Sequence, residues 1–144
     1  MNTTTDLARK PGHGAIRIRA GEAPWIAGFR CSNCGAVVTE QTMACRRCAS
    51  RKPLQPFRAS ERGSVYAWTV VERSYPGVAV PFVSVIVDLS DGLTLKGTLR
   101  SVAIESVRAG MPVALVFDDA GGAHDGSGAP YIGFHFEPAT GDRA

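Results

Sequence analysis

All four cysteines of this chain fall within eighteen consecutive residues, and their spacing restricts what that stretch can fold into. They form two Cys-x-x-Cys pairs with ten residues between the pairs: Cys31 and Cys34, then Cys45 and Cys48. Two residues between cysteines allow one tight turn to point both sulfurs toward the same place. Four thiolates that converge in this way suit a closed tetrahedral Zn²⁺ site. Because protein sulfurs would take every coordination position, we expect a structural zinc site with no catalytic role.

Two other uses of the cysteines compete with zinc. Paired disulfides are typical of small secreted proteins, and a redox-active dithiol needs only one Cys-x-x-Cys pair. The first residues, Met1–Asp6, contain neither the basic nor the apolar region of a signal peptide. No apolar run approaches the roughly 20 residues that cross a bilayer. The sequence therefore predicts a cytoplasmic protein with no membrane partner, and a reducing compartment favours zinc-bound cysteines.

Charge is unevenly distributed along the 144 residues. Residues 1–62 contain eleven Lys and Arg against four Asp and Glu, a surplus of +7, whereas residues 63–144 contain five against nine, a deficit of −4. The half that contains the cysteines is therefore basic, which suits the phosphates of a cofactor, a nucleic acid or an acidic partner protein. A solvated surface that binds nothing is the alternative.

The first 26 residues are interpreted as an N-terminal arm. Pro11, Gly12 and Gly14 interrupt any helix, and the alternation of Ala15–Ala20 indicates a short strand or an extended segment. Such an arm cannot build a core of its own, so we expect it to lie on a partner or to stay mobile. A zinc ribbon is expected over residues 27–55, with Pro53 and Pro56 marking a short linker to the next domain. Basic residues cluster on and just after the second cysteine pair: Arg46, Arg47, Arg51 and Lys52.

Five segments after the ribbon have the composition or alternation of strands. They are residues 65–71, 82–89, 93–99, 112–117 and 131–136. Asp91-Gly92 suits a hairpin turn, Gly97 suggests a bulge or a sharp coil, and residues 101–108 are compatible with a helical turn.

Five short strands with a small helix between the third and the fourth predict a five-stranded barrel of the OB type. The barrel is expected over residues 56–138 and a tail over residues 139–144. The predicted fold class is therefore mainly β, with an N-terminal rubredoxin-like zinc ribbon followed by a five-stranded OB-fold barrel.

The sequence offers no evident catalytic constellation. Every cysteine is assigned to the metal, and neither His124 nor His135 has a serine elbow or paired carboxylates beside it. His135 is expected to occupy a structural place in the last strand, and Asp118-Asp119 to be a solvated strand end. We therefore predict a protein without catalytic residues of its own.

A series of short motifs runs in a fixed order through most of the chain, from about Phe29 to Glu137. The motifs are Cys31-x-x-Cys34-Gly35, Cys45-x-x-Cys48, Gly63-x-Val65-Tyr66-x-x-Thr69-Val70-Val71, Pro81-Phe82, Asp91-Gly92, Gly97, Val107-x-x-Gly110-Met111-Pro112-Val113 and Val116-Phe117. Together they resemble a known family, the zinc-ribbon plus OB-fold proteins long called a domain of unknown function. That family usually carries a helical segment before the ribbon, which residues 11–24 replace here.

The resemblance implies an accessory subunit. Family members associate with thiolases, with acyltransferases of the thiolase fold, or with thiolase homologues that act as aldolases on steroid side chains, and the partner holds the catalytic residues. It therefore implies a hetero-oligomer with a thiolase-fold enzyme that acts on CoA thioesters, in pathways such as aromatic or steroid degradation. The accessory protein helps to bind acyl-CoA or CoA and to assemble the complex. The basic cluster then supplies the candidate CoA-binding residues: Arg46, Arg47, Arg51 and Lys52.

Binding of single-stranded nucleic acid is the alternative function, because OB barrels and basic surfaces both serve it. Tyr66, Trp68 and Phe82 are candidates to stack on bases, although a place in the barrel core is the expectation for all three. The −4 charge of the barrel half has the wrong sign for a groove that follows phosphates. We therefore expect an acyl-CoA enzyme as the partner and not a nucleic acid.

Overall fold

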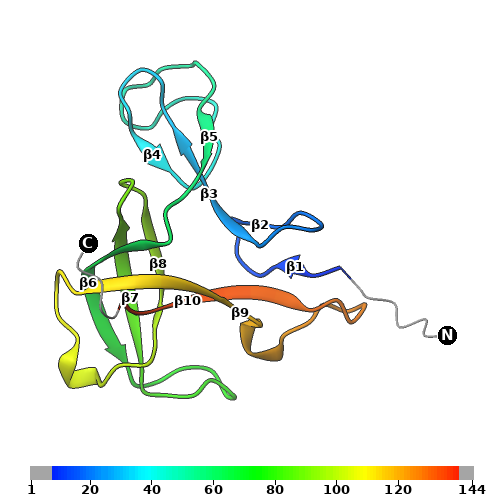
Figure 1. Ribbon diagram of the computed structural model, residues 1–144, viewed down its shortest axis with the longest axis vertical. Helices are drawn as coiled ribbons and strands as arrows, with labels where there is room; N and C mark the ends of the chain where they lie inside the picture. The colour runs from blue at the N-terminus through cyan, green and yellow to red at the C-terminus, as the bar shows by residue number, and fades with distance from the viewer. Residues whose placement is uncertain (1–7, 140–144) are drawn as a thin grey trace.

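The structure, a computed structural model, describes residues 8–139. Figure 1 shows a small body, drawn at the top, that contains β4 and parts of β3 and β5, and a larger body below it. The predicted tail lies outside the described residues except for Ala139. Within the described residues, no helix has the length and apolar character that a membrane crossing requires.

The larger body is a closed barrel. Its strands are β6 (Arg62–Val71), β7 (Phe82–Leu89), β8 (Thr94–Leu99), β9 (Pro112–Asp118) and β10 (Tyr131–Pro138). They neighbour one another in the order β6-β7-β8-β10-β9, and β9 pairs with β6 to close the ring. Only the β8–β10 pairing within this ring is parallel. Five strands closed in this order form an OB barrel, so the predicted fold class is confirmed.

The barrel core follows the alternation of β7. Val83, Val85, Val87 and Leu89 are all buried, as the sequence pattern predicts. Gly97 of β8 lies opposite Val85 in an uninterrupted ladder, so the expected bulge at this glycine is wrong. A Cβ at Gly97 would lie 3.0 Å from the ring of Phe136, a fully buried residue, so the glycine makes room for that ring. The bulge of the barrel occurs instead in β6, between Val65 and Ala67.

Two other expectations for the barrel need correction. The helical turn predicted over residues 101–108 is reduced to a three-residue 3₁₀ turn, η1 (Ile104–Ser106), because the backbone is extended on both sides of it. Tyr66 and Trp68 are 66% and 40% exposed, so their assignment to the core is wrong. Strand β6 pairs with β9 only over Arg62–Ser64, and beyond that point its free edge leaves both aromatic residues accessible.

The smaller body is a ribbon built around β3 (Trp25–Arg30), which β4 (Val37–Val38) and β5 (Gln55–Arg58) flank. Pro56 lies within β5 opposite Phe29, so the end of the predicted linker, Gln55 and Pro56, is part of the sheet. A proline is tolerated there because β5 pairs on one side only, with β3. Ala27 and Phe29 of β3 pack in the ribbon core, whereas Ile26 packs in the barrel core.

The described part of the N-terminal arm packs on its own chain, so the expectation that it needs a partner or stays mobile is wrong there. Strand β1 (Lys10–Pro11) runs parallel to β10, and β2 (Ile16–Arg17) pairs antiparallel with β3. The Gly12 N–H donates to the Ile132 carbonyl at 2.7 Å, and a Cβ on Gly12 would lie 2.9 Å from that oxygen. Ile16 is 1% exposed and joins the barrel core.

Candidate metal centre

The four cysteines of the sequence motif come together in the ribbon. Their sulfur atoms all lie within 4.8 Å of one another: Cys31, Cys34, Cys45 and Cys48. The Sγ atoms of Cys31 and Cys48 are 3.7 Å apart, as are those of Cys34 and Cys45. A disulfide requires about 2.05 Å, and all four cysteines are free. Tetrahedral coordination with metal–sulfur bonds of about 2.3 Å places sulfurs about 3.8 Å apart, so the set can hold a metal ion.

Two turns of the same kind present the sulfurs. In the first, the Gly35 N–H donates to the Cys31 carbonyl at 2.9 Å, and in the second the Ala49 N–H donates to the Cys45 carbonyl at 2.8 Å. The fifth residue of each turn has a positive φ, 79° at Gly35 and 65° at Ala49. Glycine adopts this conformation without strain, whereas alanine does so at a cost. The second turn is therefore held in place against a local backbone preference.

Hydrogen bonds around the sulfurs favour negative charge on the second cysteine pair. The Asn33 side-chain amide donates to Cys48 Sγ at 3.3 Å and lowers the pKa of Cys48 to about 6. Backbone N–H groups of Cys48 and Arg47 lower the pKa of Cys45. The Ala36 backbone acts in the same direction on Cys34, but desolvation and the neighbouring thiols outweigh it and raise the pKa of Cys34 to about 11. Since a divalent cation would remove the repulsion among four close sulfurs, the arrangement fits a tetrathiolate metal centre.

The four predicted basic residues lie around this centre but do not share one site. Arg46 and Arg47 line a cavity of about 180 Å³ together with apolar residues and Cys45 of the ribbon. Arg46 also pairs with Glu40, at 3.7 Å, and both side chains are 71% exposed. Arg51 and Lys52 are exposed beyond the second cysteine pair. Their role as CoA ligands stays a prediction.

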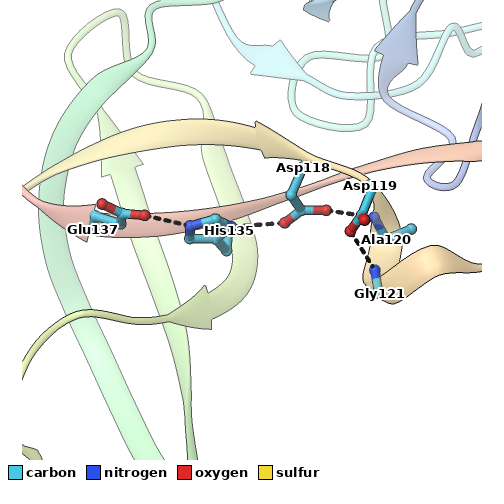
Figure 2. A network of polar contacts seen from close by, with 6 residues as sticks. All are labelled: Asp118, Asp119, Ala120, Gly121, His135 and Glu137. Carbon is cyan, nitrogen blue, oxygen red and sulfur yellow. Dashed lines mark hydrogen bonds and ion pairs between the residues drawn. The ribbon is translucent and has the colours of Figure 1, made fainter.

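A second polar cluster lies between β9 and β10, and Figure 2 shows it. His135 is 6% exposed, with Nδ1 at 2.7 Å from Asp118 Oδ2 and Nε2 at 2.6 Å from Glu137 Oε2. The other oxygen of Asp118 accepts from the Ala120 N–H at 2.8 Å, at the start of the 3₁₀ turn η2 (Ala120–Gly122). A Cβ at Gly133 would lie 2.8 Å from Asp118 Oδ1, so a larger residue there would displace this carboxylate.

This cluster has a structural use and no evident chemical one. Each ring nitrogen of His135 already contacts a carboxylate, so neither is left for a substrate. The structural interpretation of His135 thus agrees with the geometry, whereas Asp118 is not a solvated strand end. Sequence reasoning missed Glu137. Its signal was the spacing of two residues from His135, which places both on one face of a strand.

Comparisons with known proteins agree with this geometry. Residues 58–118 match the family of the ChsH2 C-terminal OB-fold domain. A DUF35 domain-containing scaffold protein of Methanocaldococcus jannaschii is 30% identical over 117 residues, which are 78% of this chain and 81% of that protein.

Two further relatives come from enzyme complexes. The benzoylsuccinyl-CoA thiolase subunit BbsA of Geobacter metallireducens is 30% identical over 80 residues, 56% of this chain and 53% of BbsA. A chain of the solved Ltp2-ChsH2(DUF35) aldolase superposes with a TM-score of 0.64 at 26% identity, covering 81% of this chain and 86% of that one. With a DUF35 scaffold protein matched over four-fifths of its length, this chain belongs to the DUF35 family.

Proposed function

We propose that this protein is a non-catalytic accessory subunit of a thiolase-like enzyme that acts on CoA thioesters. The observation that carries the proposal is the likeness to BbsA, a thiolase subunit, and to a chain of the Ltp2-ChsH2(DUF35) aldolase. A substrate of aromatic degradation fits the name of BbsA, which contains benzoylsuccinyl-CoA, whereas a steroid substrate rests on the family resemblance alone. The partner would be a subunit of the thiolase fold.

The side chains of the described residues are consistent with an accessory role. The four cysteines form one cluster, which leaves none as a nucleophile within residues 8–139. His135 has both ring nitrogens engaged, and His124 lies in an exposed loop beside the Gly122 carbonyl. Catalysis in the complex would therefore come from the partner.

The four thiolates are proposed to hold a structural Zn²⁺, which would cross-link the two turns of the ribbon: Cys31, Cys34, Cys45 and Cys48. The reducing cytoplasm, where we place the protein, keeps cysteines available for such a site. Because Arg46 and Arg47 lie between two ligands and Arg51 lies just beyond the last, a zinc-ordered ribbon would present these cations in fixed positions. We propose that this basic cluster contacts the phosphates of CoA or an acidic surface of the partner: Arg46, Arg47, Arg51 and Lys52.

Co-expression with a thiolase encoded beside this protein tests the proposal. Size-exclusion chromatography should give one complex, and removal of this subunit should lower activity of the enzyme. The chain purified alone should show no thiolysis or acyl transfer. Separate elution of the two proteins, with activity unchanged by this subunit, would refute the accessory role.

Exposure of Tyr66 and Trp68 favours nucleic-acid binding as a second candidate. Exposed aromatic side chains on an OB barrel can stack on bases of a single strand. The same protein preparation should therefore be titrated with single-stranded DNA and RNA. Tight, salt-sensitive binding that Trp68→Ala weakens would support this candidate against the first.

A further inference from the structure

A cavity of about 630 Å³ lies within the N-terminal arm, between the segment around β1 and the segment that leads from β2 to β3. Its walls are Ala8, Arg9 and Pro11 on one side, and residues 16–22 on the other. In Figure 1 these segments form the blue part of the chain around β1 and β2. Its volume is within the range of about 300–1,000 Å³ that is usual for small-molecule sites. It is separate from the cysteine cluster and from its basic residues.

Positive charge dominates the cavity. Three arginines line it, Arg9, Arg17 and Arg19, against one carboxylate, Glu22. Glu22 is already shared, because its carboxylate oxygens lie 3.3 Å from Arg19 Nη1 and 2.8 Å from Arg58 Nη2. The Arg58 hydrogen bond lowers the pKa of Glu22, which keeps this carboxylate charged and paired. Within residues 8–139, the ion pairs leave Arg9 and Arg17 without a carboxylate.

Both walls are held in place by contacts outside the cavity. The Lys10 N–H donates to the Pro130 carbonyl at 2.9 Å, and the Lys10 side chain pairs with Asp125, so the arm is fixed on β10. On the opposite wall, Arg17 Nη1 donates to the Gly14 carbonyl at 2.7 Å, which orients its guanidinium. A ligand would therefore meet walls that are already ordered, and would lose less free energy in ordering them.

The lining also has an apolar part. Pro11 is exposed and Ile18 is half-buried, and both line the cavity, whereas Ile16 is 1% exposed and contributes little surface to it. A simple inorganic anion would use the arginines but would leave this surface and most of the volume unfilled. The combination suits an organic molecule with an anionic group of at least two charges.

We infer that this cavity binds the diphosphate group of a nucleotide-type ligand, with Arg9 and Arg17 on the phosphates and the organic part against Pro11 and Ile18. Guanidinium groups match phosphate oxygens in geometry and charge. CoA carries such a diphosphate, and its identification as the ligand rests on the proposed function. The assignment of the cavity to a diphosphate group does not depend on the proposed function.

Isothermal titration of the full-length, metal-loaded protein with pyrophosphate, ADP and CoA tests the inference at low and at physiological salt. ADP and CoA should bind more tightly than pyrophosphate, since only they fill the apolar part. Arg9→Glu and Arg17→Glu should each weaken the binding of ADP and CoA by about tenfold or more. Arg73→Glu makes the same change of charge at an exposed loop residue outside the cavity and should leave binding within about twofold.

Folding is checked by circular dichroism and metal content. Arg17→Glu removes a hydrogen bond to the backbone, but the Arg9 side chain has no recorded partner within residues 8–139, so Arg9→Glu remains informative if Arg17→Glu unfolds. Three results would each overturn the inference: failure of the wild-type chain to bind any of the three ligands, binding unchanged in Arg9→Glu, or a loss that follows Arg51→Glu of the ribbon instead. Binding of ADP by a chain that forms no complex with a thiolase would refute only the proposed function.

Discussion

Replacing His135 with leucine tests whether the cluster between β9 and β10 stabilises the barrel. The substitution removes both ring-nitrogen contacts and leaves an apolar side chain of similar size at a buried position. The Asp118 side chain is 15% exposed, so water can replace its lost partner only in part. The Glu137 side chain is 37% exposed and can be hydrated.

The size of the effect follows from these exposures. An acceptor that loses its partner in a buried place costs about 1–3 kcal/mol, which applies to Asp118, while a surface contact such as that of Glu137 contributes at most about 1 kcal/mol. We therefore expect His135→Leu to lower the free energy of unfolding by about 2–3 kcal/mol. At roughly 2–4 °C per kcal/mol for a protein of this size, the Tm should fall by about 5–10 °C.

Urea unfolding of the metal-loaded protein, followed by tryptophan fluorescence, measures this loss. His124→Leu is the matched control, because His124 is exposed and, among residues 8–139, its side chain makes one polar contact, at 3.4 Å to the Gly122 carbonyl. The control should stay within about 0.5 kcal/mol of the wild type. Adding Asp118→Leu to His135→Leu should recover at most part of the loss, since it removes the oxygen that lost its partner but also removes the acceptor of the Ala120 N–H. Equal stability of the two histidine variants would refute the reasoning.

Three further predictions concern the ribbon and the arm. Cys45→Ser should lower the zinc content measured by atomic absorption and increase amide exchange over residues 29–52, while the barrel stays folded; a wild-type protein without zinc would contradict it. Ala49→Gly should stabilise the ribbon by about 1 kcal/mol, because the φ of 65° suits glycine, and metal release to a chelator should slow; faster release would count against it. Lys10 holds the pKa of Asp125 well below its ordinary value, so this pair should stabilise the docked arm at neutral pH and lose that effect as the pH falls below about 4. Protection of the Gly12 amide, measured as exchange relative to the intrinsic rate at each pH, should therefore fall on acidification, and Asp125→Asn should remove most of this dependence on pH.

Much of the fold could be predicted because it depends on local patterns. The alternation of β7 identifies its buried face, and the cysteine spacing brings four sulfurs together. The topology could also be predicted, because few closed barrels are built from five short strands with a small helical element between the third and the fourth. The barrel and the cluster of four cysteines could therefore be predicted from the sequence.

The sequence predictions are wrong where residues far apart in the chain determine the local structure. Gly97 has the composition of a bulge, but the ring of Phe136, far along the chain, explains the glycine. The arm lacks a core of its own, yet β10 and β3 supply one for Ile16. The sequence pattern predicts Tyr66 and Trp68 in the core. Their exposure depends on the point at which β9 stops pairing with β6, which the local pattern does not show. The cavity of Arg9 and Arg17 likewise exists only once the arm is docked.

Strand β3 has a consequence for any assembly that uses both bodies. It passes from the barrel core at Ile26 into the ribbon core at Ala27 without an intervening loop, and β5 runs alongside it over the same crossing. The Ala59 N–H donates to the Ile26 carbonyl at 2.8 Å, which closes the junction on the barrel side. Two paired strands restrict rotation between the ribbon and the barrel far more than a single flexible linker would. A partner that binds the ribbon therefore also fixes the orientation of the barrel. A rotation of the ribbon would turn the barrel with it.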